Sequence, residues 1–265
     1  MSNVIFYYSG IDSATLTYSA TETTNYPKEN LQDRNKNTSM RDTSLGPFDC
    51  NLIIDLGSGI TRTPDYLILG NYIFQSNGNT LITFQYSATG AFGGEQGDAF
   101  TDENCEAATL TDKLKTFTAT SAYRYWRLLV EDSNVTQITS IQLANLFFGT
   151  KWEHNHDPEI GIAKGRYYES IINESAGGNR FSQITNTTKR RSWDYDFKYI
   201  TAAERANWET WIDAVYAGNK YSHYPFYFSD DAGTTLYFVR SVGDIVFKEI
   251  AYNTWETSLR LEEEI

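Results

Sequence analysis

Short apolar runs separated by turn residues dominate the hydrophobic pattern of the chain. The stretch Asn51–Phe74 carries two of them, Leu52–Leu56 and Tyr66–Leu69, and each is too short for an ordinary helix. Gly57 and Gly70 follow the two runs and mark turns. Neither run alternates cleanly between apolar and polar positions, as is typical of strands inside a two-layer structure. We therefore predict that this stretch forms the centre of a β-sandwich core.

Alternating patterns predict further strands on both sides of this stretch. Tyr123–Asp132 places Trp126, Leu128 and Val130 on one face, and it places Tyr125, Arg127 and Leu129 on the other. Other strands are expected at Val4–Tyr8, Ala14–Ser19, Leu81–Ala88 and Ile138–Phe148. About seven or eight strands at this spacing are typical of a sandwich, so residues 1–150 are predicted to form one.

The composition changes after residue 150, which predicts a domain boundary. Residues 151–166 are rich in charged and turn residues, including Pro158 and two glycines, and are expected to be a linker. Residues 167–265 are predicted to form a β-rich, barrel-like domain. Its strands are expected at Tyr167–Asn173, Arg180–Thr185, Ser192–Ile200, Tyr224–Phe228, Thr235–Val242, Ile245–Tyr252 and Trp255–Leu261.

One amphipathic helix, over residues 202–217, is expected in this second domain. Thr201 and Glu204 have the spacing of a capping box, and Gly218 stands where a helix-terminating glycine belongs. The apolar positions recur with helical spacing at Trp208, Trp211, Ile212 and Val215. The two Trp rings would form either an exposed sugar platform or the cover of a sheet, and this spacing favours the cover.

Composition and charge exclude several functional classes. Aromatic residues make up 15% of the chain, which favours strands, and the net charge of −12 argues against a nucleic-acid partner. The cysteines, Cys50 and Cys105, form no zinc or disulfide pattern and are expected to be reduced thiols. No apolar run is long enough to span a bilayer and no signal peptide is seen. We expect synthesis and folding in a cytoplasm, with no membrane insertion.

Two groups of polar residues are candidate metal sites. The loop Thr21–Phe48 carries oxygen ligands that suit calcium at Asn30, Asp33, Asn35, Asn37 and Asp42. The spacing of a dedicated site is absent, which favours a solvated loop whose side chains bond their own backbone. His154, His156 and Asp157 are the only clustered residues that suit a transition metal. The two alternating histidines can share a strand face, but a zinc or iron site needs a third ligand placed by the fold, so linker histidines are favoured. No metal and no cofactor is therefore predicted.

Catalytic signatures are absent from the sequence, so we predict that the protein is not an enzyme. There is no GxSxG motif, and Asp230-Asp231 sits in an evident turn. Paired carboxylates for glycoside cleavage remain open, because the fold chooses such a pair. The glycines between Gly90 and Gly97 lack the context of a phosphate loop. The basic cluster Lys189–Arg191 is expected at a strand edge or against an acidic neighbour.

A family resemblance rests on the order of short motifs in the first half of the chain. The motifs are Asn30-Leu31, Ile54-Asp55-Leu56-Gly57, Asp65–Tyr72, Thr83–Ser87 and Tyr125-Trp126-Arg127-Leu128. In this order they resemble the discoidin-like (galactose-binding-like) jelly-roll domains of phage tail proteins. In the second half, Arg191-Ser192-Trp193, the capped helix and Tyr224-Pro225-Phe226 resemble the small β-barrel domains of baseplate and distal tail proteins.

This resemblance implies a structural component of a phage tail tip or baseplate. Such a protein would assemble in the host cytoplasm into a ring with copies of itself and with other tail proteins, and would reside in the virion. An alternative is a carbohydrate-binding adhesin that contacts host glycan through loop Gly90–Asp98 or loop Asn30–Arg41. A third is an accessory domain pair of a polysaccharide-degrading enzyme. No residue matches a known sugar site clearly enough to be assigned.

Overall fold

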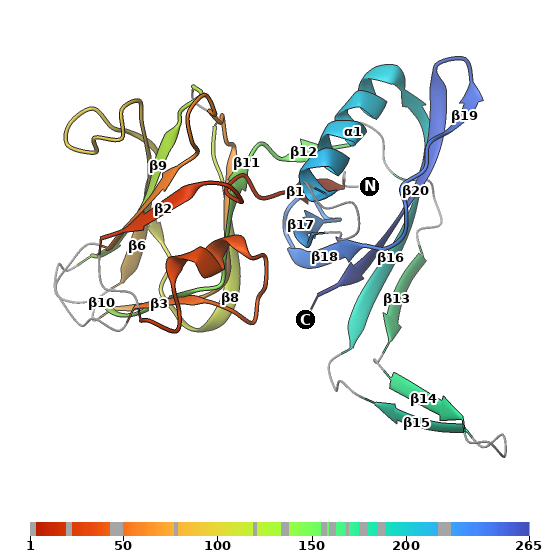
Figure 1. Ribbon diagram of the computed structural model, residues 1–265, viewed down its shortest axis with the longest axis horizontal. Helices are drawn as coiled ribbons and strands as arrows, with labels where there is room; N and C mark the ends of the chain where they lie inside the picture. The colour runs from red at the N-terminus through yellow and green to blue at the C-terminus, as the bar shows by residue number, and fades with distance from the viewer. Residues whose placement is uncertain are drawn as a thin grey trace. The chain divides into compact units, whose positions relative to one another are not determined.

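The protein is mainly β, which confirms the predicted class (Figure 1). The computed structural model describes residues 4–19, 23–42, 50–76, 79–118, 121–133, 138–154, 158, 163–167, 170–174, 180–184, 189–216 and 224–264. Within these ranges the chain contains one α-helix, and its sheets are antiparallel. Two compact units are present. One is Tyr7–Lys151, and the other combines Met1–Phe6 with Trp152–Ile265.

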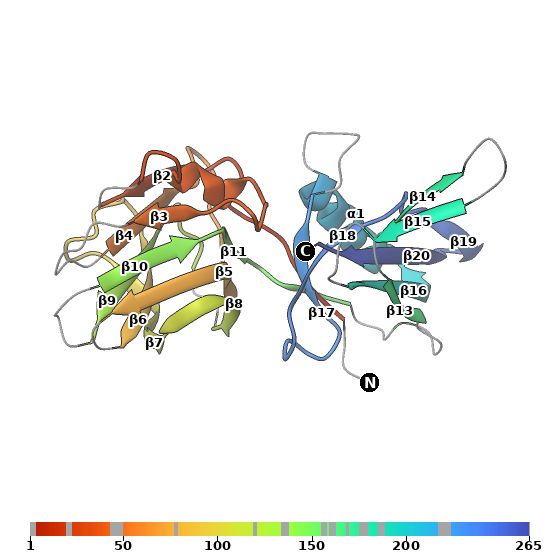
Figure 2. The same cartoon turned by 90° about the horizontal axis from the view of Figure 1, so that it is seen from below.

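The unit Tyr7–Lys151 is a sandwich of two sheets (Figure 2). One sheet has the order β2-β4-β9-β6-β7, and its strands are Thr15–Tyr18, Cys50–Asp55, Tyr125–Asp132, Thr80–Ser87 and Gly97–Asn104. The other has the order β11-β5-β10-β3, with β8 also paired to β5. Its strands are Asn145–Gly149, Tyr66–Ser76, Ile138–Leu143, Met40–Asp42 and Ala107–Thr116.

Aromatic side chains from both sheets meet in the sandwich core. The ring of Phe84 on β6 stacks on Trp126 of β9 at 5.1 Å, and it contacts Phe148 of β11 edge-on at 5.3 Å. All three side chains are fully buried. The predicted alternation of β9 is confirmed, because Trp126, Leu128 and Val130 are buried while Tyr125 and Arg127 are half-buried. The alternation of this strand therefore fixes which face is core.

The stretch Asn51–Phe74 was expected to be buried on both faces, and one of its two strands differs from this expectation. In β4, Leu52 and Ile54 are buried while Asn51, Ile53 and Asp55 are only half-buried, so the strand has an inner and an outer face. In β5 the first residues, Tyr66–Gly70, are all buried, as predicted. The expectation was wrong for β4 because its outer face lies on the surface of the sandwich.

The observed elements of the sandwich differ from the predicted ones in three further ways. The segment predicted as one strand, Ile138–Phe148, is two strands interrupted at Ala144, and both pair with β5. The polar segment Thr21–Phe48 contains a 3-10 helix, Lys28–Gln32, as well as β3. Strands β7 and β8 carry charged and small polar residues, and hydrophobic alternation does not reveal them.

The second unit contains one large sheet with helix α1 (Ala202–Tyr216) on one face (Figure 1). The sheet has the order β12-β1-β17-β18-β20-β16-β13, and β19 also pairs with β20. Its strands are Trp152–Glu153, Ile5–Tyr7, Phe226–Ser229, Tyr237–Ser241, Thr254–Glu263, Arg190–Thr201, Ala163–Tyr167 and Lys248–Ala251. A separate hairpin joins β14 (Ser170–Glu174) to β15 (Arg180–Ile184).

The first strand of the chain belongs to this second unit, which corrects the predicted domain layout. Phe6 pairs with Trp152 and Ile5 with Glu153, so β1 and β12 form an antiparallel ladder. The predicted sandwich, residues 1–150, therefore loses its first strand, and the predicted linker, residues 151–166, contains β12 and β13. Local sequence could not show this, because the two paired strands lie far apart along the chain.

Helix α1 begins with the predicted capping box. The backbone N–H of Thr201 donates to Oε2 of Glu204 at 2.8 Å, and the N–H of Glu204 donates to the Thr201 hydroxyl at 3.3 Å. These bonds satisfy amides that a helix start leaves unpaired. Gly218, the predicted helix terminator, lies outside the described residues. Trp208 and Trp211 are buried, so the prediction that they cover the sheet is confirmed.

Candidate functional site

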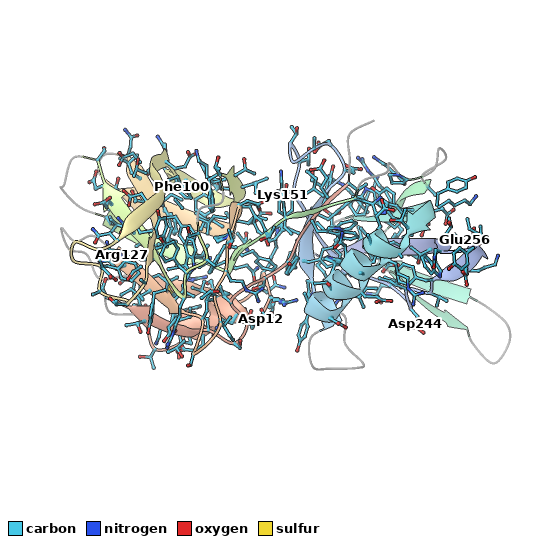
Figure 3. The ribbon with its side chains drawn as sticks, turned by 90° about the horizontal axis from the view of Figure 1, so that it is seen from above. Asp12, Phe100, Arg127, Lys151, Asp244 and Glu256 are labelled. Atoms are coloured by element: carbon cyan, nitrogen blue, oxygen red, sulfur yellow. The ribbon has the colours of Figure 1, made fainter. Side chains whose placement is uncertain are left out.

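The outer face of β4, β9 and β6 carries two rows of side chains, which are half-buried on β4 and β9 and buried on β6. Strand register places Tyr125 between Asp55 and Ser87, and it places Arg127 between Ile53 and Gln85. Cross-strand neighbours on one face lie about 5 Å apart, so each row is a continuous line of contacts. Arg127 lies on the side of the sandwich away from Lys151 (Figure 3). We call this surface the β9 face.

A chain of hydrogen bonds fixes Arg127 on the β9 face. Its Nε donates to Oε1 of Gln85 at 2.7 Å, and Nε2 of Gln85 donates to Oδ1 of Asp98 at 2.7 Å. The guanidinium carbon also lies 4.6 Å from the ring centroid of Phe92, within cation–π range. The guanidinium is thus held in one orientation while the side chain remains half-exposed to solvent.

The second row is held by an ion pair. Arg124 donates from Nε and Nη2 to the two carboxylate oxygens of Asp55 at 2.6 and 2.7 Å, which is a bidentate pair. These hydrogen bonds hold the pKa of Asp55 below its usual range, so the carboxylate is charged at neutral pH. The Arg124 guanidinium also lies 4.7 Å from the Tyr125 ring centroid.

The loop between β6 and β7 supplies Phe92 and is ordered by its own side chains. Glu95 accepts from the backbone N–H of Thr89 at 3.1 Å and from the hydroxyls of Thr89 and Ser87. Gly90 has a φ of +86°, and a Cβ placed there would lie 3.1 Å from the Tyr125 ring. Only glycine fits both requirements without strain. The loop is therefore built to lie against the β9 face.

The two loops proposed from the sequence behave differently. Loop Gly90–Asp98 contributes Phe92 and Asp98 to the β9 face. In loop Asn30–Arg41, Asp33 accepts from the backbone N–H of Asn35 at 2.8 Å. The sequence missed Gln85 and Asp55, because only the strand register brings them beside Arg127 and Tyr125. The outward positions of β9 were the one signal that pointed to this face.

The five oxygen ligands considered for calcium do not converge. Asn35 accepts from the backbone N–H of Asn37 at 2.9 Å, Asn30 donates to the carbonyl of Ser39, and the buried Asp42 accepts from the Tyr18 hydroxyl. Together with the Asp33 bond, the Asn30 and Asn35 contacts match the predicted loop whose side chains bond nearby backbone, whereas Asp42 is buried in β3 and bonds a side chain. Across the described residues, no group of three or more His, Cys, Asp or Glu side chains is placed to hold a metal ion.

His154 corrects the prediction of linker histidines. Its side chain is 1% exposed and lies in an aromatic cluster, with ring centroids 4.6 Å from Phe197 and 5.7 Å from Trp208. The reason is that β12 joins the sheet and carries the chain into the core of the second unit. His156 and Asp157 lie outside the described residues, as does His223.

Two smaller predictions have clear outcomes. Arg191 contacts an acidic neighbour, as expected, since its Nε lies 3.8 Å from Glu263 and its backbone N–H donates to the same carboxylate. It is not at a sheet edge, because β16 has β20 and β13 on its two sides. Cys50 and Cys105 are free thiols, as predicted, and both are buried; burial raises the pKa of the Cys105 thiol to about 12.

Among the described residues, no helix combines the length and apolarity that a bilayer crossing requires.

Comparisons with known proteins were made for the whole chain. No family of known sequences and no curated protein matches it. Among solved structures, it is similar to chitosan-binding module 1 from a chitosanase/glucanase of Paenibacillus sp. IK-5, with 17% identity and a TM-score of 0.41 over 53% of this chain and 98% of the module. It is also similar to the family 32 carbohydrate-binding module of Clostridium perfringens NanJ in complex with galactose, with 15% identity and a TM-score of 0.41, covering 56% and 99%.

A third similar structure is CBM32-1 from a family 31 glycoside hydrolase of Clostridium perfringens. Its identity is 14% and its TM-score 0.41, over 54% of this chain and 98% of the module. All three are described as carbohydrate-binding modules, and none of them is a tail protein. At scores of this size, the function of the chain has to be argued from its own side chains.

Proposed function

We propose that the protein is a glycan-binding module and that the β9 face contacts the sugar. The observation that carries this proposal is the fixed Arg127 guanidinium, which is held between Gln85 and Phe92 on an outer sheet face. Guanidinium and amide groups form hydrogen bonds with sugar hydroxyls, and aromatic rings pack against the apolar faces of sugar rings. The β9 face presents both kinds of group within one short stretch of surface.

Prior ordering of these groups supports binding. An interaction made by a side chain that is already fixed loses less conformational entropy than one made by a free side chain. Arg127 is restrained by Gln85, and Arg124 is restrained by Asp55. The proposed contact site is therefore the β9 face together with its overlying loop, Gly90–Asp98.

The test is glycan binding by matched arginine variants. We expect Arg127→Ala to weaken binding to a glycan selected on an array by roughly 10- to 100-fold, because charge-assisted hydrogen bonds contribute about 1.5–3 kcal/mol. Isothermal calorimetry measures the change. Arg41→Ala is the control, since its guanidinium lies 4.3 Å from the Tyr26 ring centroid, on the other candidate loop.

The two variants give distinct outcomes. Binding lost in Arg127→Ala and kept in Arg41→Ala supports the β9 face. Loss of glycan binding in Arg41→Ala alone would assign the binding site to loop Asn30–Arg41 and contradict its assignment to the β9 face. Absence of binding to any glycan by the unaltered protein would contradict the function itself. Circular dichroism of each variant establishes that the fold is retained.

A second candidate function is assembly with further copies of the chain, as in a virion tail tip or baseplate. Exposed apolar side chains of the second unit support it. Val246, Ile250 and Tyr252 are 67%, 38% and 89% exposed around β19, and Tyr199 on β16 is 68% exposed. Among the described strands, β19 pairs only with β20, so one edge is available to the same strand of another copy. A ring would need a second, different surface.

Sedimentation velocity tests this candidate. We expect the unaltered protein to form an oligomer whose dissociation constant rises at least tenfold in Ile250→Lys, because a charge would be buried in the contact. Leu110→Lys is the control, since Leu110 is 49% exposed on the other unit. A protein that is monomeric at all concentrations, or equal weakening by both variants, would exclude assembly through β19.

A further inference from the structure

A pocket of about 270 Å³ lies within the second unit, at the end of its sheet. It is formed by β13, β16, the start of β18 and the turn after β17. Its lining residues are Lys164, Gly165, Arg166, Arg191, Ser192, Trp193, Asp230 and Tyr237. Three of these side chains are cationic and one is a carboxylate, in a chain whose net charge is −12. The pocket is therefore a local exception to the charge of the protein.

Strand register explains how the cations come together. In the β13–β16 ladder, Arg166 lies directly opposite Arg191, and Lys164 lies directly opposite Trp193. Residues directly opposite each other in an antiparallel pair project from the same face of the sheet. All four side chains thus share one face of the sheet, on the edge strand β13 and its neighbour β16.

The positive charge in the pocket is only partly compensated. Lys164 pairs with Asp230, and Nε of Arg191 lies 3.8 Å from Glu263, near the outer limit of an ion pair. Arg166 has no ion pair or hydrogen bond with any described residue, and it is exposed. Like charges directly opposite in a sheet destabilise it unless something neutralises them. The pair Arg166–Arg191 accordingly places two cations where one anion can contact both.

We propose that this pocket binds the carboxylate of a small acidic ligand of about one sugar unit, such as a hexuronate. Two guanidinium groups match the planar oxyanion of a carboxylate with paired hydrogen bonds. Half-buried Tyr237, whose ring centroid lies 4.9 Å from that of Trp193, supplies an apolar wall for the rest of the ligand. The volume is just below the lower limit of about 300 Å³ for drug-sized ligands.

Asp230 in the pocket lining favours a carboxylate ligand over a phosphate. Its carboxylate repels any bound anion, and the repulsion grows with the charge of the ligand. A monoanionic carboxylate is therefore preferred over a dianionic phosphate. The pocket lies entirely in the second unit and shares no residue with the β9 face on the sandwich.

Calorimetry of the full chain at low ionic strength tests the proposal with galacturonate, galactose and inorganic phosphate. We expect galacturonate to bind, galactose not to bind, and phosphate to bind more weakly. Arg166→Gln should weaken galacturonate binding about tenfold or more, as the loss of a charge-assisted pair predicts. Lys248→Gln is the matched control, since Lys248 is an exposed cation of the same unit and its loss changes the net charge equally.

Asp230→Asn supplies a gain-of-binding test. Removing this carboxylate should strengthen phosphate binding at least tenfold, since it removes the repulsion and releases Lys164. The proposal is overturned if galacturonate does not bind, if galactose binds equally well, or if Lys248→Gln weakens binding as much as Arg166→Gln. Phosphate that binds more tightly than galacturonate to the unaltered protein overturns the carboxylate assignment. Arg127→Ala leaves galacturonate binding unchanged, which separates this site from the proposed glycan site.

Discussion

Ile54→Asp is expected to prevent folding of the sandwich. Ile54 is 0% exposed, at the centre of the β4 core face, and it belongs to a cluster of buried apolar residues. Burying an unpaired carboxylate costs more than about 4–5 kcal/mol, a large part of the roughly 5–15 kcal/mol that stabilises a typical domain. Leu67→Asp on β5 should act in the same way, since Leu67 is 1% exposed in the same core.

The neighbouring residue gives the matched control for this prediction. Ile53 is half-buried on the outer face of β4, beside Arg127, so Ile53→Asp places the same charge near solvent and a cation. We expect this variant to fold. Circular dichroism and soluble yield measure the difference between the variants. A soluble, cooperatively folded Ile54→Asp protein would show that the predicted core is wrong.

Trp208→Ala is expected to lower the free energy of unfolding of the second unit by about 3–5 kcal/mol, because a large cavity replaces the indole. Trp208 is 0% exposed and packs against other aromatic rings. Centroids of these rings lie at 4.7 Å for Trp152, 5.1 Å for Phe197, 5.7 Å for Trp211, 6.2 Å for Phe6 and 6.1 Å for Phe247. These neighbours come from several strands, so the loss affects the whole aromatic cluster.

Two companion variants separate packing from hydrogen bonding at this position. The indole Nε1 of Trp208 has no hydrogen-bond partner among the described residues, so Trp208→Phe should cost much less than Trp208→Ala. Glu209→Ala, one residue along on the exposed face of α1, should change stability by less than about 0.5 kcal/mol. Urea unfolding gives all three values. Equal losses in the Ala and Phe variants at Trp208 would contradict the packing explanation.

The elements that sequence predicted are those whose signal is local. The strict alternation in β9 and β16 and the capping box Thr201–Glu204 all lie within short stretches of chain, and each was found where expected. Strands β7 and β8 have little apolar periodicity, because many of their side chains are polar and partly exposed. No local signal could show that β1 pairs with β12.

The candidate sites depend on strand register, and register is a long-range property. The outward position of Arg127 was predictable, but its contact with Gln85 requires the β6–β9 pairing. Lys164 and Arg166 alternate along β13, yet their meeting with Arg191 and Asp230 depends on pairing across the sheet and on a distant turn. The sequence thus indicated which face of its own strand a residue occupies, whereas strand pairing determines which residues of different strands lie together.

The pairing of β1 with β12 means that the sandwich is an insertion between two strands of a single sheet. The chain leaves that sheet after β1 and returns to it at β12, and the partners Phe6 and Trp152 flank the inserted unit. A domain with its own hydrophobic core tolerates the insertion of another domain between two of its strands. We therefore expect the second unit to accept different sandwiches, so that the proposed glycan-binding surface can be exchanged without rebuilding the unit that carries it.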